Sequence, residues 1–131
     1  YTFASEELFR RTISEIVART KPGSKLIGVV PDSTFVLAQG ARYTDSIGNY
    51  ILRNEERTGH GEFGETIWVC VKDTLYYKDD EPIPEPIAYK DIIIQSLRDA
   101  GFVLESWRPF VSHITGYISD MYSEFIFTRV Y

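Results

Sequence analysis

The order of predicted elements indicates an α/β fold whose sheet is mostly parallel, with one antiparallel strand at its end. Apolar side chains recur at helical spacing in residues 5–20, and a short apolar run follows at 25–30. A second amphipathic helix is predicted for 89–100, and a strand follows it at 102–107. Residues 123–130 alternate in polarity and form the predicted final strand.

The first helix has recognisable ends. Ser5 is a suitable N-cap, and Glu6 and Glu7 follow in the first turn, where the helix dipole favours acidic side chains. Pro22-Gly23 stops the helix. The run 25–30 then reads as a buried parallel strand, which ends at Pro31 because proline cannot donate to a strand ladder.

The middle of the chain is more polar. Residues 45–64 are predicted to form a long loop, and 65–72 a strand with 75–78 as its hairpin partner. Residues 79–86 contain three prolines and four acids and are expected to be extended and exposed. The remaining segments are a short helix at 33–38 that Asp32 or Ser33 caps, and an irregular stretch at 111–121.

Length and charge restrict the function. The chain has 131 residues, which is enough for a single domain over 1–131 with a modest core. Its net charge of −5 argues against sequence-independent binding along a nucleic-acid backbone, which needs a basic face. A pocket for one nucleotide is still compatible with that charge, and the aromatic content of 15% supplies rings that can stack on a base.

Several kinds of site are absent from the sequence. Cys70 is the only cysteine, so the chain has no intrachain disulfide and no cysteine-based zinc site, and a reducing intracellular setting is expected. His60 and His113 are far apart, and no metal-binding motif surrounds either. The sequence has no nucleophile elbow, no phosphate-binding loop, no membrane-length apolar run and no signal-peptide pattern. No catalytic side chain is predicted.

Pro31-Asp32-Ser33 is the first candidate site, since ligands of open α/β sheets bind beyond the carboxyl ends of the strands. The same three residues also suit a simple strand stop and helix cap. Two other candidates have equally simple alternatives. Glu85 could belong to a solvated acidic linker, and Tyr122 could be a core or edge aromatic.

Five short segments, taken in order, resemble the C-terminal half of the mRNA cap guanine-N7 methyltransferases, a class I family that uses S-adenosylmethionine. The segments are YTFASEE at 1–7, KPGSKLIGVVPD at 21–32, Phe63-Gly64-Glu65 with the strand after it, PEPIAY at 84–89, and MYSEFIF at 121–127. The second segment departs from the family at one point, because it has Gly23-Ser24 where the family has two glycines.

The resemblance implies the C-terminal half of a Rossmann-like class I methyltransferase sheet, and a cap pocket built partly from this half. Pro31 would pack on the cap, and Glu85 would accept hydrogen bonds from the N1–H and amino edge of guanine. Tyr122 would close the pocket. Tyr1 and Phe3 would lie between cofactor and cap, with Tyr1 on the cofactor side. The cofactor-binding N-terminal half would be missing, since the chain begins at Tyr1, and the 131 residues alone would be inactive.

The activity implied is methyl transfer from S-adenosylmethionine to guanine N7. That atom carries a lone pair and no proton, so the reaction would need positioning and electrostatics but no general base. The expected partners are the capped 5′ end of RNA and the N-terminal half of the enzyme or other capping subunits, with no membrane. The expected location is the nucleus for a cellular enzyme and the cytoplasm for a viral one.

Three alternatives stay open. The chain could belong to a class I methyltransferase of another RNA, such as a tRNA, or of a small molecule. It could belong to a non-catalytic subunit with the methyltransferase fold that stimulates a capping enzyme. It could also be an isolated portion of a long capping polypeptide.

Overall fold

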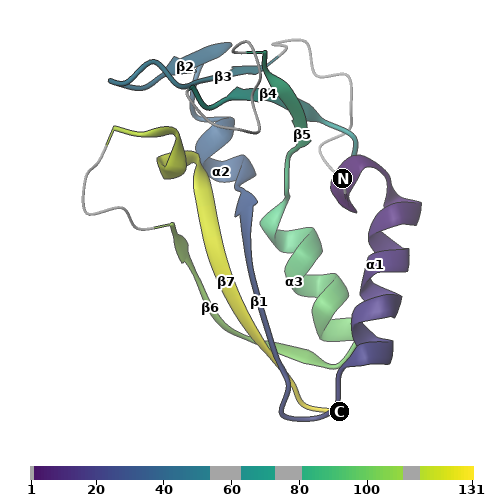
Figure 1. Ribbon diagram of the computed structural model, residues 1–131. Coiled ribbons are helices and arrows are strands. Elements are labelled where there is room, and N and C mark those ends of the chain that lie inside the picture. The colour runs from purple at the N-terminus through teal and green to yellow at the C-terminus, as the bar shows by residue number, and fades with distance from the viewer. Residues whose placement is uncertain (1, 54–62, 73–80, 111–115) are drawn as a thin grey trace.

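The computed structural model describes residues 2–53, 63–72, 81–110 and 116–131, which form two sheets and the helices packed against them (Figure 1). The strand orders are β1-β7-β6 and β2-β3-β4-β5. The strands are β1 (Lys25–Pro31), β2 (Arg42–Thr44), β3 (Tyr50–Arg53), β4 (Thr66–Cys70), β5 (Ile83–Pro86), β6 (Phe102–Pro109) and β7 (Tyr122–Arg129). The helices are α1 (Glu6–Arg19), α2 (Ser33–Val36) and α3 (Lys90–Asp99), with short 3-10 helices η1 (Thr2–Ala4) and η3 (Ile118–Met121).

The predicted helices are present, with the predicted caps. The Ser5 hydroxyl accepts a hydrogen bond from the Leu8 amide at 3.2 Å, which satisfies one of the free donors at the start of α1. The helix predicted for 89–100 is α3, and Gly101 follows it with a φ of 93°. A left-handed glycine directly after a helix lets the chain reverse into the next strand, here β6.

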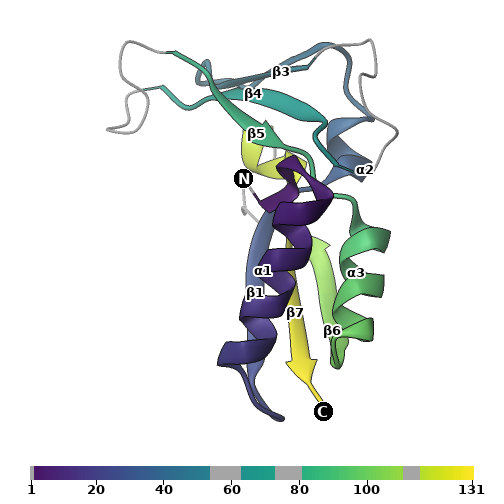
Figure 2. The same ribbon diagram turned by 90° about the vertical axis from the view of Figure 1, so that its right-hand side faces the viewer.

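Both long helices cover one face of the three-stranded sheet (Figure 2). Phe9 of α1 and Leu97 of α3 meet Phe102 and Phe127 of the sheet in one buried cluster. Burial of these large apolar side chains is the main stabilising contribution here, at roughly 1.5–3 kcal/mol each.

The opposite face of that sheet is open. Ile27, Val29 and Val103 are 68%, 49% and 50% exposed, and ion pairs join Lys25 to Glu105 and Arg108 to Glu124 across the strands. The prediction of a buried strand at 25–30 is therefore wrong. The side chains of β1 alternate between core and solvent, as expected for a sheet that is covered on one side only.

The four-stranded sheet lies above α2 and η3 in Figure 1. Ile51, Ile67 and Val69 on its inner face pack with Val36 of α2 and Met121 of η3 in a second buried cluster. This sheet corrects the prediction of a single loop at 45–64, because β3 occupies residues 50–53 and pairs with β2. Residues 54–62 of that loop, and the strand predicted at 75–78, lie outside the described residues.

The segment 79–86 is also less exposed than predicted. Its last four residues form β5, which pairs with β4, and Pro86 is buried. Proline is tolerated at an edge strand such as β5, which has a neighbour on one side only.

The predicted mostly parallel, Rossmann-like sheet is contradicted. All five strand pairings among the described residues are antiparallel, and a single isolated bridge, between Asp32 and Ala88, is parallel. The prediction assumed that each helix returns the chain to the same sheet. Instead, α2 and α3 each connect strands of different sheets, and β7 inserts between β1 and β6. The right-handed crossover that produces parallel neighbours therefore does not occur within either sheet.

Candidate functional site

The carboxyl end of β1 meets the start of β7 at the junction between the two sheets. Pro31, the last residue of β1, is paired in register with Tyr122, the first residue of β7. The Pro31 carbonyl accepts a hydrogen bond from the Ala88 amide at 3.0 Å, which ties this junction to the connection between β5 and α3. Two segments that are distant in the sequence thus lie side by side at a strand end.

Glu85 reaches the same junction from β5. Its partner in β4 is Ile67, which is completely buried, and opposed residues of an antiparallel pair share a face. The Glu85 carboxylate is therefore on the inner side of the four-stranded sheet. There the Tyr122 hydroxyl donates a hydrogen bond of 2.6 Å to its Oε2 atom.

The structure thus brings together three of the residues that the sequence singled out: Pro31, Glu85 and Tyr122. A carboxylate has about four acceptor positions, and Tyr122 uses one of them. Glu85 is only half-buried, so its carboxylate can accept hydrogen bonds from a ligand. Pro31 itself is buried, so the groups at this strand end that can contact a ligand are the carboxylate and the phenol. Together they can bind a planar group that has hydrogen-bond donors on one edge.

Phe3 lies beside this cluster but in a different environment. Its helix η1 packs against β5, and the Phe3 carbonyl accepts a hydrogen bond of 3.0 Å from the Gly64 amide. The ring of Phe3 lies 5.4 Å from that of Phe9, centroid to centroid, and Phe9 lies 5.4 Å from Phe63. Phe3 therefore belongs to an aromatic group at the end of the core. Tyr1, the predicted cofactor-side residue, lies outside the described residues.

A second carboxylate–phenol pair lies just beyond the C-terminal end of β5. The Tyr89 hydroxyl donates a hydrogen bond to Glu65, and the Ile87 amide donates one to the Glu65 carbonyl at 2.7 Å. Glu65 is buried, with 7% of its surface exposed. Two of the sequence motifs, Phe63-Gly64-Glu65 and the segment from Pro84 to Tyr89, therefore contact each other directly.

Asp32 belongs to the Pro31-Asp32-Ser33 candidate, for which the sequence left open a ligand site or a simple helix cap. It does cap α2, because its Oδ1 atom accepts a hydrogen bond from the Thr34 amide at 2.9 Å. Its Oδ2 atom accepts two more, from the Ser123 hydroxyl at 2.6 Å and from the Trp107 indole at 3.0 Å. The only signal in the sequence was an acidic residue placed directly after an apolar strand.

The electrostatics of Asp32 follow from these contacts. Burial raises the pKa of its carboxyl, but the hydrogen bonds from Ser123, Trp107 and Thr34 outweigh burial and hold the pKa below its usual value. Asp32 is 2% exposed, and it is ionised at neutral pH. Its fully bonded carboxylate suits a structural function better than contact with a ligand.

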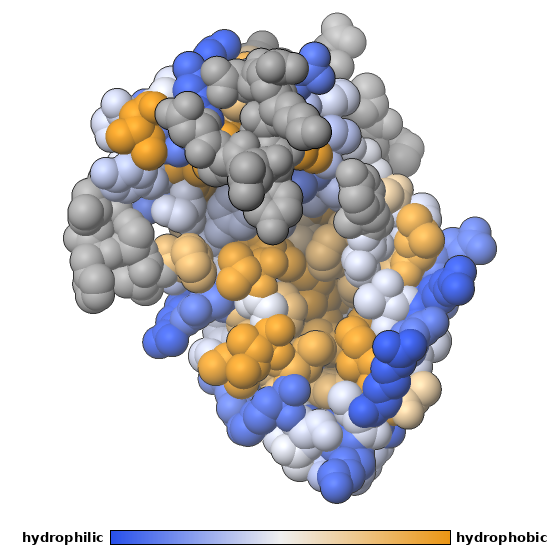
Figure 3. All heavy atoms as spheres, viewed as in Figure 1, coloured by the Kyte–Doolittle hydropathy of each residue, from blue (hydrophilic) through white to orange (hydrophobic). Residues whose placement is uncertain are grey.

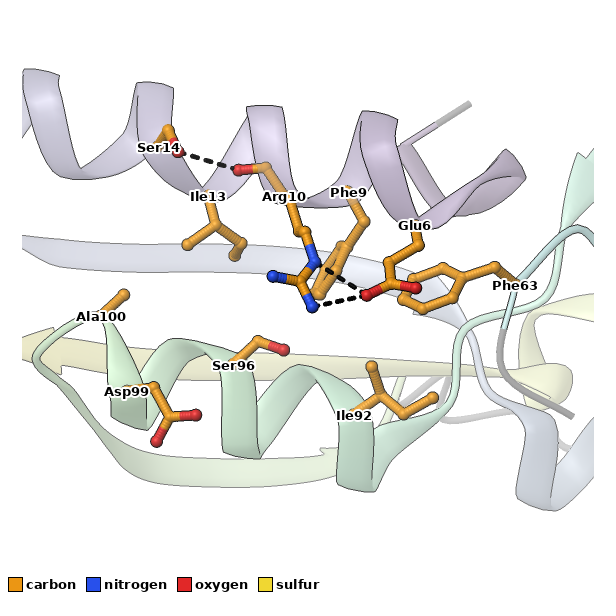
Figure 4. Close-up of a pocket in the computed structure, with 10 residues that line it drawn as sticks. All are labelled: Glu6, Phe9, Arg10, Ile13, Ser14, Phe63, Ile92, Ser96, Asp99 and Ala100. Carbon is orange, nitrogen blue, oxygen red and sulfur yellow. Dashed lines mark hydrogen bonds and ion pairs between the residues drawn. The ribbon is translucent and has the colours of Figure 1, made fainter.

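A groove of about 660 Å³ lies between α1 and α3, away from this cluster. Phe9, Ile13 and Ile92 form its apolar lining, and the ion pair of Arg10 with Glu6 lies beside them (Figure 4). In Figure 3, apolar side chains gather across the middle of the molecule, and hydrophilic residues border them along the outer side of α1. None of Pro31, Glu85 and Tyr122 lines the groove. The polar residues of its lining are Glu6, Arg10, Ser14, Ser96 and Asp99.

Neither a metal-binding cluster nor a membrane-spanning helix is present in the described part of the chain. No group of three or more His, Cys, Asp or Glu side chains is placed there to hold a metal ion. Among the same residues, no helix has both the length and the apolar character needed to cross a bilayer.

Comparison with known proteins finds a solved structure of similar fold. No protein-family model matches the chain, and no curated protein matches its sequence. Among solved structures, the CcbJ methyltransferase from Streptomyces caelestis matches with a TM-score of 0.57 over 99% of this chain, at 8% sequence identity. The chain spans 56% of the length of that protein. At so low an identity the similarity is one of fold alone: the chain shares the fold of part of that protein.

Proposed function

We propose that this chain forms the guanine-binding wall of an S-adenosylmethionine-dependent methyltransferase that acts on N7 of the mRNA cap. The observation that carries the proposal is the hydrogen bond of 2.6 Å between Tyr122 and Glu85, at a strand end that also holds Pro31. The methyltransferase fold of the CcbJ neighbour supports the general class of reaction. The guanine specificity rests on the chemistry of this cluster and on the sequence motifs.

In this proposal Glu85 recognises the base. The Watson–Crick edge of guanine presents two donors, N1–H and the amino group, which match the two oxygens of one carboxylate. Tyr122 holds that carboxylate in place through its hydroxyl. Pro31 is buried and pairs with Tyr122 in the sheet, so in this proposal it forms the base of the wall beneath these two side chains. A negative charge next to the base also favours the positive charge that guanine acquires when N7 is alkylated.

The reaction places few demands on this chain. Guanine N7 attacks with a lone pair and loses no proton, so no general base is required, and binding and orientation are the main contributions of the residues described. In this proposal the part of the methyltransferase that binds S-adenosylmethionine lies outside the described residues. Their glycines with positive φ, at 23, 48, 64, 101 and 116, lie in separate turns, and no glycine-rich loop joins a strand to a helix there.

The proposal is tested by isothermal titration calorimetry of the 131-residue chain with the dinucleotides GpppG and ApppA. We expect saturable binding of GpppG and much weaker binding of ApppA, which lacks the donor at N1. Glu85→Gln should weaken GpppG binding about 10- to 100-fold, since hydrogen bonds to a charged group contribute about 1.5–3 kcal/mol.

Glu81→Gln is the matched control. It removes one carboxylate from the same acidic segment, but Glu81 is exposed and lies outside β5. Its GpppG affinity should equal that of the wild type. Equal affinity for GpppG and ApppA, or a Glu85→Gln variant with wild-type affinity, would rule out guanine recognition by this cluster.

Substrate class is tested separately with the whole enzyme. Transfer of radiolabel from S-adenosylmethionine should reach capped RNA but not tRNA or free GTP. Labelling of tRNA alone would identify a methyltransferase of another RNA. An absence of transfer, combined with stimulation of a separate capping enzyme, would identify the non-catalytic subunit.

A further inference from the structure

Asp32 forms hydrogen bonds with the residue before Tyr122 and with the residue after it. The carbonyl of the preceding residue, Met121, accepts a hydrogen bond of 2.9 Å from the Asp32 amide. The hydroxyl of the following residue, Ser123, donates one of 2.6 Å to the Asp32 carboxylate. Asp32 is itself adjacent to Pro31, the residue paired with Tyr122 in the sheet. Asp32 therefore forms hydrogen bonds with both sequence neighbours of Tyr122, and it follows Pro31 directly in the chain.

The Asp32 carboxylate also links three elements around this point. It bonds to Trp107 of β6, to Ser123 of β7 and to the first turn of α2 at Thr34. Both Asp32 and Ser123 are shielded from water, with 2% and 0% of their surfaces exposed. Hydrogen bonds in such a dry environment have well-defined geometry, because water does not compete for the donors.

We propose that Asp32 is the positioning residue of the candidate cap pocket: it holds Tyr122 where the Tyr122 hydroxyl reaches Glu85. This inference rests on the proposed function, and it assigns Asp32 a specific part in it. Asp32 does not touch the base. It acts through Tyr122, and so on the Glu85 carboxylate that receives the guanine edge.

Asp32→Asn is the sharpest variant, because an amide has nearly the same shape as the carboxylate. With its nitrogen in the Oδ2 position, the amide faces the Trp107 indole, which can only donate. With its nitrogen in the Oδ1 position, the amide faces the Thr34 backbone N–H, which can also only donate. Either orientation loses at least one hydrogen bond of the network.

The first measurement concerns structure alone and needs no ligand. In NMR spectra of the 131-residue chain, Asp32→Asn should shift the Trp107 indole N–H signal. It should also speed amide hydrogen exchange at Tyr122 and Ser123, while the exchange rates of α1 and α3 stay at their wild-type values. Unchanged exchange at Tyr122 would contradict the positioning function.

The second measurement is a double-mutant cycle with GpppG affinity as the readout. Asp32→Asn should weaken binding about 5- to 10-fold when Glu85 is present, and should have no further effect in the Glu85→Gln variant. A residue that merely stabilises the fold would have the same effect in both backgrounds. Additive losses would therefore contradict the proposal.

Ile93→Val in α3 is the stability control. Ile93 is 2% exposed and belongs to the core on the helix side of the three-stranded sheet. This variant should lower the melting temperature and leave GpppG affinity unchanged. If the wild-type chain does not bind GpppG, the proposed function fails. The exchange measurement still decides whether Asp32 holds Tyr122.

Discussion

At the residue scale, two buried aspartates hold the start of β7 and the segment before it. Asp32 bonds to Ser123, and Asp45 accepts a hydrogen bond from the Ile118 amide at 3.3 Å. Asp45 is 7% exposed and also bonds to the side chain of Asn49 at 3.1 Å. Each carboxylate receives donors from residues far along the chain. A buried acidic group is compatible with stability only when such donors replace its lost hydration.

The lowered pKa of Asp32 predicts a specific dependence of stability on pH. As the pH falls below the unfolded-state pKa of about 3.9, the unfolded chain binds a proton at this residue before the folded chain does. The contribution of Asp32 to stability is therefore complete above that pH and is lost as the pH falls through the folded-state pKa. Asp32→Asn should flatten this part of the stability curve, measured by urea unfolding from pH 2 to pH 7.

Asp99→Asn serves as the control for that experiment. The Asp99 carboxylate is exposed at the end of α3, and its hydrogen bond of 2.8 Å from the Gln95 side chain is also exposed, so it contributes little to stability. Its stability curve should follow that of the wild type. If the unfolding free energy of Asp32→Asn changed with pH below pH 4 as that of the wild type does, the hydrogen bonds assigned to the Asp32 carboxylate would be contradicted.

At the scale of the element, β1 has one face covered by the core and one open face. On the covered face, Gly28 leaves the space that an aromatic ring of β7 occupies. The ring of Phe125 lies directly over Gly28, which is its partner in β7. A Cβ atom at position 28 would overlap that ring. Glycine is disfavoured in strands for entropic reasons, so its presence here is explained by the close approach of the aromatic ring.

Gly28→Val should destabilise the chain by about 1–3 kcal/mol, because Phe125 would have to move within a packed core. The free energy of unfolding in urea measures this loss. Ile27→Thr tests the adjacent position on the open face, where the side chain is 68% exposed, and should change stability by about 0.5 kcal/mol or less. Equal effects of the two substitutions would contradict the two-faced description of β1.

At the scale of the whole molecule, the candidate site exists because two sheets meet. Pro31 and Tyr122 belong to the three-stranded sheet, and Glu85 belongs to the four-stranded one. The chain matches 56% of the CcbJ methyltransferase, and its described residues form no glycine-rich cofactor loop. Substrate recognition and cofactor binding are therefore proposed to reside in different parts of the enzyme.

This separation predicts that the 131-residue chain binds S-adenosylmethionine weakly, with a Kd above about 100 μM, equivalent to roughly −5.5 kcal/mol or weaker. Calorimetry under the conditions of the GpppG titration measures it, and GpppG binding shows that the sample is folded and competent. A Kd in the low micromolar range for S-adenosylmethionine would overturn the separation.

The sequence by itself determined the local features. The N-cap at Ser5, the end of β1 at Pro31 and the turn at Gly101 follow from the chemistry of individual residues and their immediate neighbours. The candidates Pro31, Glu85 and Tyr122 came from the family resemblance, and their function stays a prediction. Their contact was not predictable from spacing, because 37 residues separate Glu85 from Tyr122.

Only the tertiary structure decided the direction of the strands and the partners of Asp32. A helical pattern between two strands does not show whether both strands join one sheet, and here they do not. Trp107 and Ser123 lie 75 and 91 residues beyond Asp32, so their convergence depends on the packing of β6 and β7 against β1. Local preferences act over a few residues, whereas strand order and a buried hydrogen-bond network are set by contacts between distant parts of the chain.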